Sequence, residues 1–174
     1  MSATFTMAQV NDMDRATFVD VFGQVYEESP WVAERAWEQK PFSDRAALAN
    51  AMVQVVRAAG SNQVLALLRA HPQLGIVASM SGYSREEQAG AGLAAASEED
   101  RRVLAKLNED YEAKFGFPFI IAVRGHTPAS IIKACSSRLS ADYEPETQQS
   151  LEQVCKIGGL RLADLIDDPL PNTG

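Results

Sequence analysis

Apolar residues recur at three- and four-residue steps along most of the chain, which is the spacing of one face of a helix. This pattern predicts helices over residues 11–27, 43–60 and 61–70. In the first of these, Phe18 and Phe22 would face the core while the residues between them face water. The chain therefore begins as a series of amphipathic helices.

Polar caps, prolines and glycines indicate where these helices begin and end. Ser29 followed by Pro30 predicts the start of a short helix that carries Trp31 and Trp37 into the core. Gly60 is expected to end the 43–60 helix with left-handed backbone geometry. Each boundary follows from the chemistry of one or two residues.

The second half of the chain continues the helical pattern with one interruption. Helices are predicted to begin at Ser84, Ser97, Thr127 and Pro145. Residues 115–123 combine Gly, Pro, aromatic and β-prone residues, and one such run cannot form a sheet by itself. We therefore predict an all-α fold of roughly eight helices with one extended apolar segment near the site.

The length of the chain fits a single domain. Its 174 residues fall within the roughly 100–200 residues of a typical domain. The core is expected to cover about residues 10–166, with a short apolar segment at 76–80 and a polar tail at 167–174. No internal repeat or linker divides the sequence, so 1–174 is predicted to be one domain.

Composition narrows the classes of partner. Hydrophobic content is 46%, yet no run approaches the roughly 18 apolar residues of a membrane span. The net charge is −7 without a Lys/Arg cluster, which argues against a nucleic-acid partner. The N-terminal residues lack a secretory leader, and Cys135 and Cys155 have no CxxC spacing and are expected to be buried thiols. We predict a cytoplasmic protein.

His71 is the first candidate for chemistry. Proline at position 72 disfavours helical geometry at its predecessor, so the imidazole is expected at the end of a helix on a fixed backbone. The negative end of the helix dipole would favour the protonated ring, which suits a proton donor. A histidine at such a position is also common as a structural group. The second histidine, His126, is expected in a surface turn.

The segment from Ser84 to Gln88 is the second candidate. Ser84 and Glu87 have the spacing of a capping box, which is a structural device. The same helix start would leave N–H groups free for a carboxylate, and Gln88 adds an amide with donors and an acceptor. Arg138 is more commonly a capping or ion-pairing residue, although a guanidinium can also grip a substrate carboxylate.

Several kinds of site are absent from the sequence. It contains no GxGxxG or GxxxxGK[ST] loop, no GxSxG motif and no His/Cys metal spacing. We therefore predict no metal, no nucleotide and no other cofactor.

The order of short motifs resembles one family, the 2-oxo-4-hydroxy-4-carboxy-5-ureidoimidazoline (OHCU) decarboxylases of urate degradation. The matching pieces are His71-Pro72-x-Leu74, Ser84-x-x-Glu87-Gln88-x-x-Ala91-Gly92-Leu93, Asn108-x-x-Tyr111-x-x-Lys114-Phe115-Gly116-Phe117-Pro118-Phe119-Ile120, Arg138-Leu139 and Arg161-Leu162-x-Asp164-Leu165. Each piece is common by itself, but the ordered set is specific.

This resemblance implies a homodimeric carboxy-lyase that converts the ureidoimidazoline to (S)-allantoin without a cofactor. It implies that His71 and Glu87 are catalytic. The substrate-binding positions it implies are Pro72, Ser84, Arg85, Glu86, Glu87, Gln88, Phe119, Ile120, Ile121, Ala122, Val123 and Arg138. The extended backbone at 119–123 would offer the substrate N–H and C=O groups that no helix uses.

The chain departs from the family pattern at two places. Gln73 replaces an acidic residue in the run that begins at His71, and Ala141 replaces the asparagine expected after the late arginine. Two alternatives therefore stay open: a catalytically silent helical ligand-binding module, and a lyase that acts on a related ureide.

Overall fold

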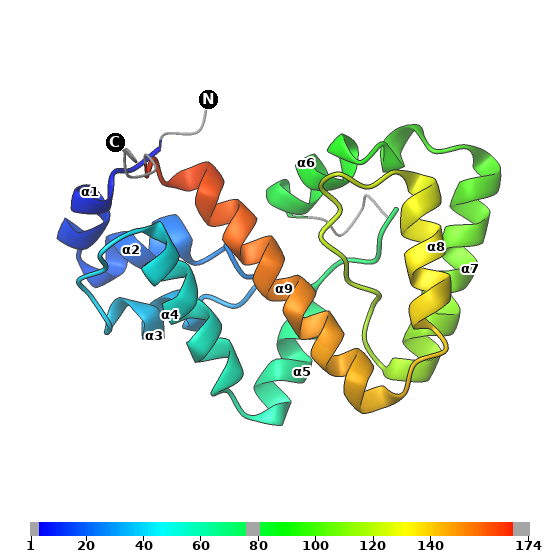
Figure 1. Ribbon diagram of the computed structural model, residues 1–174, viewed down its shortest axis with the longest axis horizontal. Helices are drawn as coiled ribbons and strands as arrows, with labels where there is room; N and C mark the ends of the chain where they lie inside the picture. The colour runs from blue at the N-terminus through cyan, green and yellow to red at the C-terminus, as the bar shows by residue number, and fades with distance from the viewer. Residues whose placement is uncertain (1–3, 76–80, 169–174) are drawn as a thin grey trace, which may run out of the picture. The chain divides into compact units, whose positions relative to one another are not determined.

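The computed structural model describes residues 4–75 and 81–168, and the described residues are helical with loops between the helices (Figure 1). The helices are α1 (Met7–Asp12), α2 (Arg15–Phe22), α3 (Trp31–Trp37), α4 (Arg45–Arg57), α5 (Ser61–Ala70), α6 (Gly82–Gly90), the 3-10 helix η2 (Leu93–Ala95), α7 (Glu98–Phe115), α8 (Pro128–Arg138) and α9 (Tyr143–Leu165). The all-α prediction is confirmed. The predicted apolar segment at 76–80 lies outside the described residues.

The chain forms two compact units. One unit consists of Met1–Ser61 with Ile157–Gly174, and the other consists of Asn62–Lys156. Helix α9 contributes its first part to the second unit and its last part to the first. Every residue predicted to take part in the site belongs to the second unit.

In the first unit, α3 packs on both α2 and α4 (Figure 1). The predicted helix over residues 11–27 is not continuous: the range holds the end of α1 and the whole of α2, which stops at Phe22. Asp14 caps α2 with an oxygen that accepts a hydrogen bond of 2.8 Å from Thr17 N. The same bond holds the pKa of the exposed Asp14 carboxyl below its usual value. Phe18 and Phe22 face the core as the pattern predicted.

Two predicted helix boundaries in this unit are wrong. Ser29 does not cap α3, since its hydroxyl donates to the carbonyl of Glu27 and Pro30 takes the cap position without a side-chain bond. Gly60 does not end α4, which finishes at Arg57 with Ala58 still in right-handed geometry. The left-handed cap expected of a glycine is found instead at Gly116, which follows α7 with a φ of 78°.

The predicted polar tail is not free at its start. Asp167 N donates to Phe5 O at 2.9 Å, and the Asp168 carboxylate accepts a 2.8 Å bond from Arg45 N. These bonds join residues far apart in sequence, so local polarity could not reveal them. The rest of the tail lies outside the described residues.

In the second unit, α7 and α8 lie side by side, and residues 117–123 run as a buried segment without helix or strand (Figure 1). The rings of Phe115, Phe117 and Phe119 surround that of Tyr111, with centroids between 4.6 and 5.9 Å away. The predicted extended apolar segment is therefore confirmed.

Candidate functional site

His71 directly follows α5, where the geometry imposed by Pro72 ends the helix. The side chain is 8% exposed, and its Nδ1 lies 2.9 Å from the carbonyl oxygen of Leu67. A carbonyl can only accept, so Nδ1 carries the proton of the neutral ring and the lone pair is on Nε2. One turn of helix thus fixes both the orientation and the tautomer of this imidazole.

Helix α6 begins earlier than the sequence predicted. Ser81 is its N-cap and accepts a bond of 3.2 Å from Ser84 N, so Ser84 lies inside the first turn and does not cap it. The predicted capping box of Ser84 and Glu87 is therefore wrong as a helix start. Gly82 is the first residue of the helix.

The residues of α6 divide into two faces. Ser84 and Gln88 are one turn apart and both are 5% exposed. Glu87 is half-buried, whereas Arg85 and Glu86 are exposed. Of the five predicted positions in α6, the structure therefore turns Ser84 and Gln88 into the protein and Arg85 and Glu86 toward solvent.

Gln88 is linked to the segment that follows His71. Gly75 N donates a hydrogen bond of 2.9 Å to Gln88 Oε1. Since the oxygen of the amide takes this bond, the orientation of the amide is assigned and its NH2 group lies at the opposite edge. The contact brings the His71 segment and α6 together.

Backbone groups at 119–123 are partly occupied. Phe119, Ile120, Ile121, Ala122 and Val123 are all at most 9% exposed. Ile120 O accepts a bond of 2.7 Å from Arg138 Nη1, and Ala122 N donates one of 3.0 Å to Gln153 Oε1. Val123 O also accepts a bond of 2.9 Å from His126 N. The expectation that this backbone is wholly available to a ligand is therefore wrong at these three groups.

Arg138 is held by protein groups on several sides. Besides Ile120, its Nε donates to Glu146 at 2.8 Å and its Nη2 contacts Glu146 at 2.6 Å and Ser150 at 3.1 Å. The guanidinium carbon lies 4.6 Å from the centroid of the Phe119 ring. Little donor capacity remains for a substrate carboxylate, so the structure gives Arg138 mainly a supporting place beside the extended segment.

Three further residues in this region were not predicted from the sequence. Glu146 and Gln153 lie on α9 and reach Arg138 and Ala122, while Asn108 Nδ2 on α7 donates to Leu74 O at 2.9 Å. Only Asn108 carried a signal, because it belongs to one of the matching motifs. The contacts of the other two depend on how α9 packs.

The structure also has a small cavity beside this region. Its volume is about 80 Å³, and the residues around it include Leu74, Gly75, Leu93, Asn108 and Ile132. None of the predicted catalytic or substrate-binding residues lines it. Within the described ranges, no group of three His, Cys, Asp or Glu residues could hold a metal ion. The helices of those ranges include none that is long and apolar enough to cross a membrane.

A buried histidine, a buried amide and a half-buried carboxylate thus lie on a helical scaffold. The family model for OHCU decarboxylase matches residues 11–163, so the chain belongs to the OHCU decarboxylase family. It is a decarboxylase.

Curated relatives agree with this assignment. The OHCU decarboxylase of Haloferax volcanii is 43% identical over 159 residues, which is 91% of this chain and 95% of the relative. That of Halalkalicoccus jeotgali is 42% identical over 92% of this chain and 91% of the relative. The uric acid degradation bifunctional protein PucL of Bacillus subtilis is 40% identical over 94% of this chain, which corresponds to 33% of that protein.

Two solved structures have the same fold. A crystal structure of (S)-allantoin synthase has a TM-score of 0.75 and 29% identity over 93% of this chain. The chain spans about half of that protein, since the match covers 54% of it. A crystal structure of OHCU decarboxylase in the presence of (S)-allantoin has a TM-score of 0.69 and 27% identity, over 82% of this chain and 94% of the other.

Proposed function

We propose that this decarboxylase converts 2-oxo-4-hydroxy-4-carboxy-5-ureidoimidazoline to (S)-allantoin and CO2, with His71 as its proton-transfer residue. Membership of the family and the substrate for which the relatives are named support the reaction. The observation that carries the role of His71 is its bond from Nδ1 to Leu67 O, which makes Nε2 the ring nitrogen assigned to exchange a proton. The proposal needs no cofactor.

The substrate supplies its own electron sink. When the bond between the ring and the carboxylate breaks, the electron pair enters the adjacent C=N and carbonyl system of the imidazoline. The resulting enol-like ring must then accept a proton on one face to give a single enantiomer. The protein therefore has to position the ring, balance its charge and deliver one proton, and acid–base help of this kind contributes roughly 10²–10⁴-fold.

His71 is proposed to move the proton through Nε2. Because Nδ1 is tied to Leu67, protonation of Nε2 gives an imidazolium whose second N–H already has an acceptor. Glu87, on the same unit, is proposed to hold the substrate hydroxyl or a ring N–H. Its half-buried carboxylate suits this role better than the exposed Glu86 next to it.

Gln88 is proposed to bind an acceptor of the substrate. Its oxygen is occupied by Gly75 N, so its NH2 group is the edge that can donate. A ureido or ring carbonyl is the matching partner. Ser84, on the same buried face of α6, is proposed to complete this polar edge, together with Pro72 and the backbone of 119–123.

Arg85, Glu86 and Arg138 have weaker support as direct contacts. The first two side chains are exposed, and Arg85 N already donates to Ser81 O at 3.0 Å. Arg138 is proposed to act chiefly by holding the carbonyl of Ile120 in place. This arrangement avoids a tight grip on the departing carboxylate, which would stabilise the ground state.

We also propose that the protein is a cytoplasmic homodimer, as the family resemblance and the sequence suggest. Light scattering coupled to size-exclusion chromatography tests the assembly. A mass twice that of one chain is expected, and a single-chain mass would contradict the dimer.

The test of the reaction is circular dichroism of the product after freshly generated ureidoimidazoline is mixed with the protein. Rapid appearance of optically active (S)-allantoin is expected with the unaltered chain and with His126→Ala, and it should be lost with His71→Ala. His126 is a matched control, because it is the other histidine and its Nδ1 lies 2.9 Å from the hydroxyl of Ser130 in the first turn of α8. Slow racemic decay in all three samples would overturn the proposal and favour a binding module or another ureide.

A further inference from the structure

The segment after His71 is attached to α7 at two successive residues. The side-chain amide of Gln73 donates to the carboxylate of Glu112, and the carbonyl of Leu74 accepts the 2.9 Å bond from Asn108 Nδ2. Asn108 and Glu112 are four residues apart, so they lie on one face of α7, one turn from each other. Together they form two parallel attachments between a helix and a loop.

The next residue carries this geometry on to Gln88. Gly75 has a φ of +85°, a conformation that glycine adopts without strain, and its N–H is the donor to Gln88 Oε1. The five residues from His71 to Gly75 therefore connect the proposed proton donor, α7 and the proposed substrate amide. A shift of this segment would move His71 and Gln88 at once.

The burial of the Asn108 side chain carries a free-energy cost. It is 1% exposed, and its Oδ1 has no hydrogen-bond partner among the described residues. An unsatisfied buried acceptor is unfavourable, and an apolar side chain would avoid it. The hydrogen bond that Asn108 Nδ2 donates to Leu74 O offsets this cost.

The uncharged amide of Gln73 suits a partner that is a carboxylate. It stands where the family resemblance has an acidic residue, and Glu112 lies opposite it. A carboxylate at position 73 would face another carboxylate, whereas an amide can donate to it. The departure of this chain from the family pattern is thus consistent with its own helix α7.

We propose that Gln73, Asn108 and Glu112 are positioning residues that hold His71 and Gln88 in register by fixing the 71–75 segment to α7. The inference rests on the proposed function, since it assigns these residues a purpose only through His71 and Gln88. They act on the reaction by placement and contact no substrate atom.

The decisive experiment exchanges donor and acceptor. Gln73→Glu keeps the shape of the side chain but puts two carboxylates together, so kcat is expected to fall about two- to fivefold, the range of one exposed charge contact. Gln73→Glu combined with Glu112→Gln restores one donor and one acceptor, and kcat is expected to return. Asn108→Leu removes the inner attachment and should lower kcat about ten- to a hundredfold, because small misplacements of catalytic groups are expensive.

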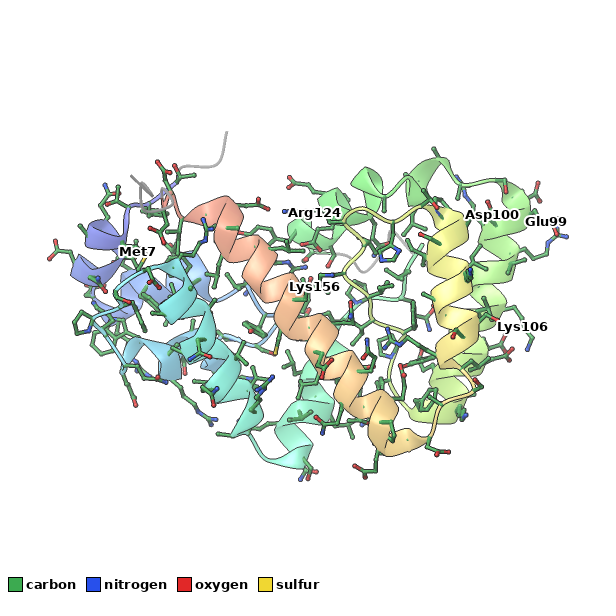
Figure 2. The ribbon with its side chains drawn as sticks, in the orientation of Figure 1. Met7, Glu99, Asp100, Lys106, Arg124 and Lys156 are labelled. Atoms are coloured by element: carbon green, nitrogen blue, oxygen red, sulfur yellow. The ribbon has the colours of Figure 1, made fainter. Side chains whose placement is uncertain are left out.

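Lys106→Ala is the control on the same helix. Figure 2 shows Lys106 on the outer edge of α7, on the side away from α8, and its ion pair is with Asp110. Its kcat should match that of the unaltered chain. Thermal unfolding of each variant separates a loss of placement from a loss of fold, since the exchange variants should unfold at nearly the same temperature.

NMR resonances of the His71 ring give a readout that does not depend on turnover. They should shift in Gln73→Glu and return in the double variant. Unchanged ring resonances and unchanged kcat in Gln73→Glu, or failure of the double variant to recover, would overturn the inference. If the ring responds as expected while the unaltered chain makes no allantoin, the positioning stands and the proposed function fails.

Discussion

Arg138 and Ile120 are joined by a hydrogen bond of 2.7 Å from guanidinium Nη1 to the backbone carbonyl. The two residues are 18 positions apart, on α8 and on the extended segment. Since the segment has no helix or strand to hold its backbone, this side chain does part of that work. Arg138 therefore links the shape of the proposed site to the carboxylate of Glu146.

Replacement of this arginine tests the link. Arg138→Lys keeps a charge for Glu146 but lacks the planar fork that reaches Ile120 and Ser150 together. We expect a higher KM and a lower unfolding temperature. A direct contact between Arg138 and substrate, without the supporting role, would instead raise KM and leave the unfolding temperature unchanged.

The hydroxyl of Tyr111 tests the buried polar cluster. It donates to Glu146 at 2.5 Å, and burial together with this bond raises the pKa of the phenol well above its usual value. Tyr111→Phe should lower the free energy of unfolding by about 1.5–3 kcal/mol, because a buried carboxylate loses a donor. Urea titration measures the change, and an unchanged midpoint would contradict it.

Two adjacent glycines of α9 provide a matched pair. A Cβ at Gly158 would lie 2.9 Å from two ring carbons of Tyr26, whereas a Cβ at Gly159 would have no described atom within 4 Å. Gly158→Ala should destabilise the protein by about 1–3 kcal/mol through overpacking. Gly159→Ala should stabilise it by about 0.5–1 kcal/mol, since alanine favours a helix. Equal effects in denaturant titrations would show that Tyr26 yields freely.

The two thiols should differ in reactivity. Cys135 is fully buried, and burial raises its pKa to about 11, whereas Cys155 is half-buried. A thiol reagent at neutral pH is expected to modify Cys155 first and Cys135 only after unfolding, because the thiolate is the reactive form. Mass spectrometry of partly labelled protein, with Cys155→Ser as control, locates the label. Rapid labelling of Cys135 in the folded variant would contradict the burial.

The raised pKa of Cys135 also makes the free energy of unfolding depend on pH. The unfolded thiol ionises near 9.0, but the folded one stays protonated until about 11. Its contribution is thus fully present below pH 9 and is lost as pH rises toward 11. Cys135→Ala should make unfolding less sensitive to pH in this window, as denaturant titrations at pH 8 and pH 10.5 would measure.

Much of the fold was determined by local sequence. The three-to-four spacing around Leu48 and Met52 placed α4, Thr127 and Pro128 marked the start of α8, and Pro72 marked the residue at which α5 stops. Each of these features depends on atoms within one or two helical turns. For the same reason the position of His71 after α5 could be predicted, together with its fixed backbone.

Only the tertiary structure decided the partners of the site residues. Hydrogen bonds join Asn108 to Leu74, Arg138 to Ile120 and Gly75 to Gln88. These pairs are 34, 18 and 13 positions apart in sequence, respectively. Such contacts depend on how α6, α7 and α8 pack, which no local pattern encodes. The start of α6 at Gly82 shows the same limit on a smaller scale. Both Ser81 and Ser84 can cap a helix, and only the folded chain distinguished them.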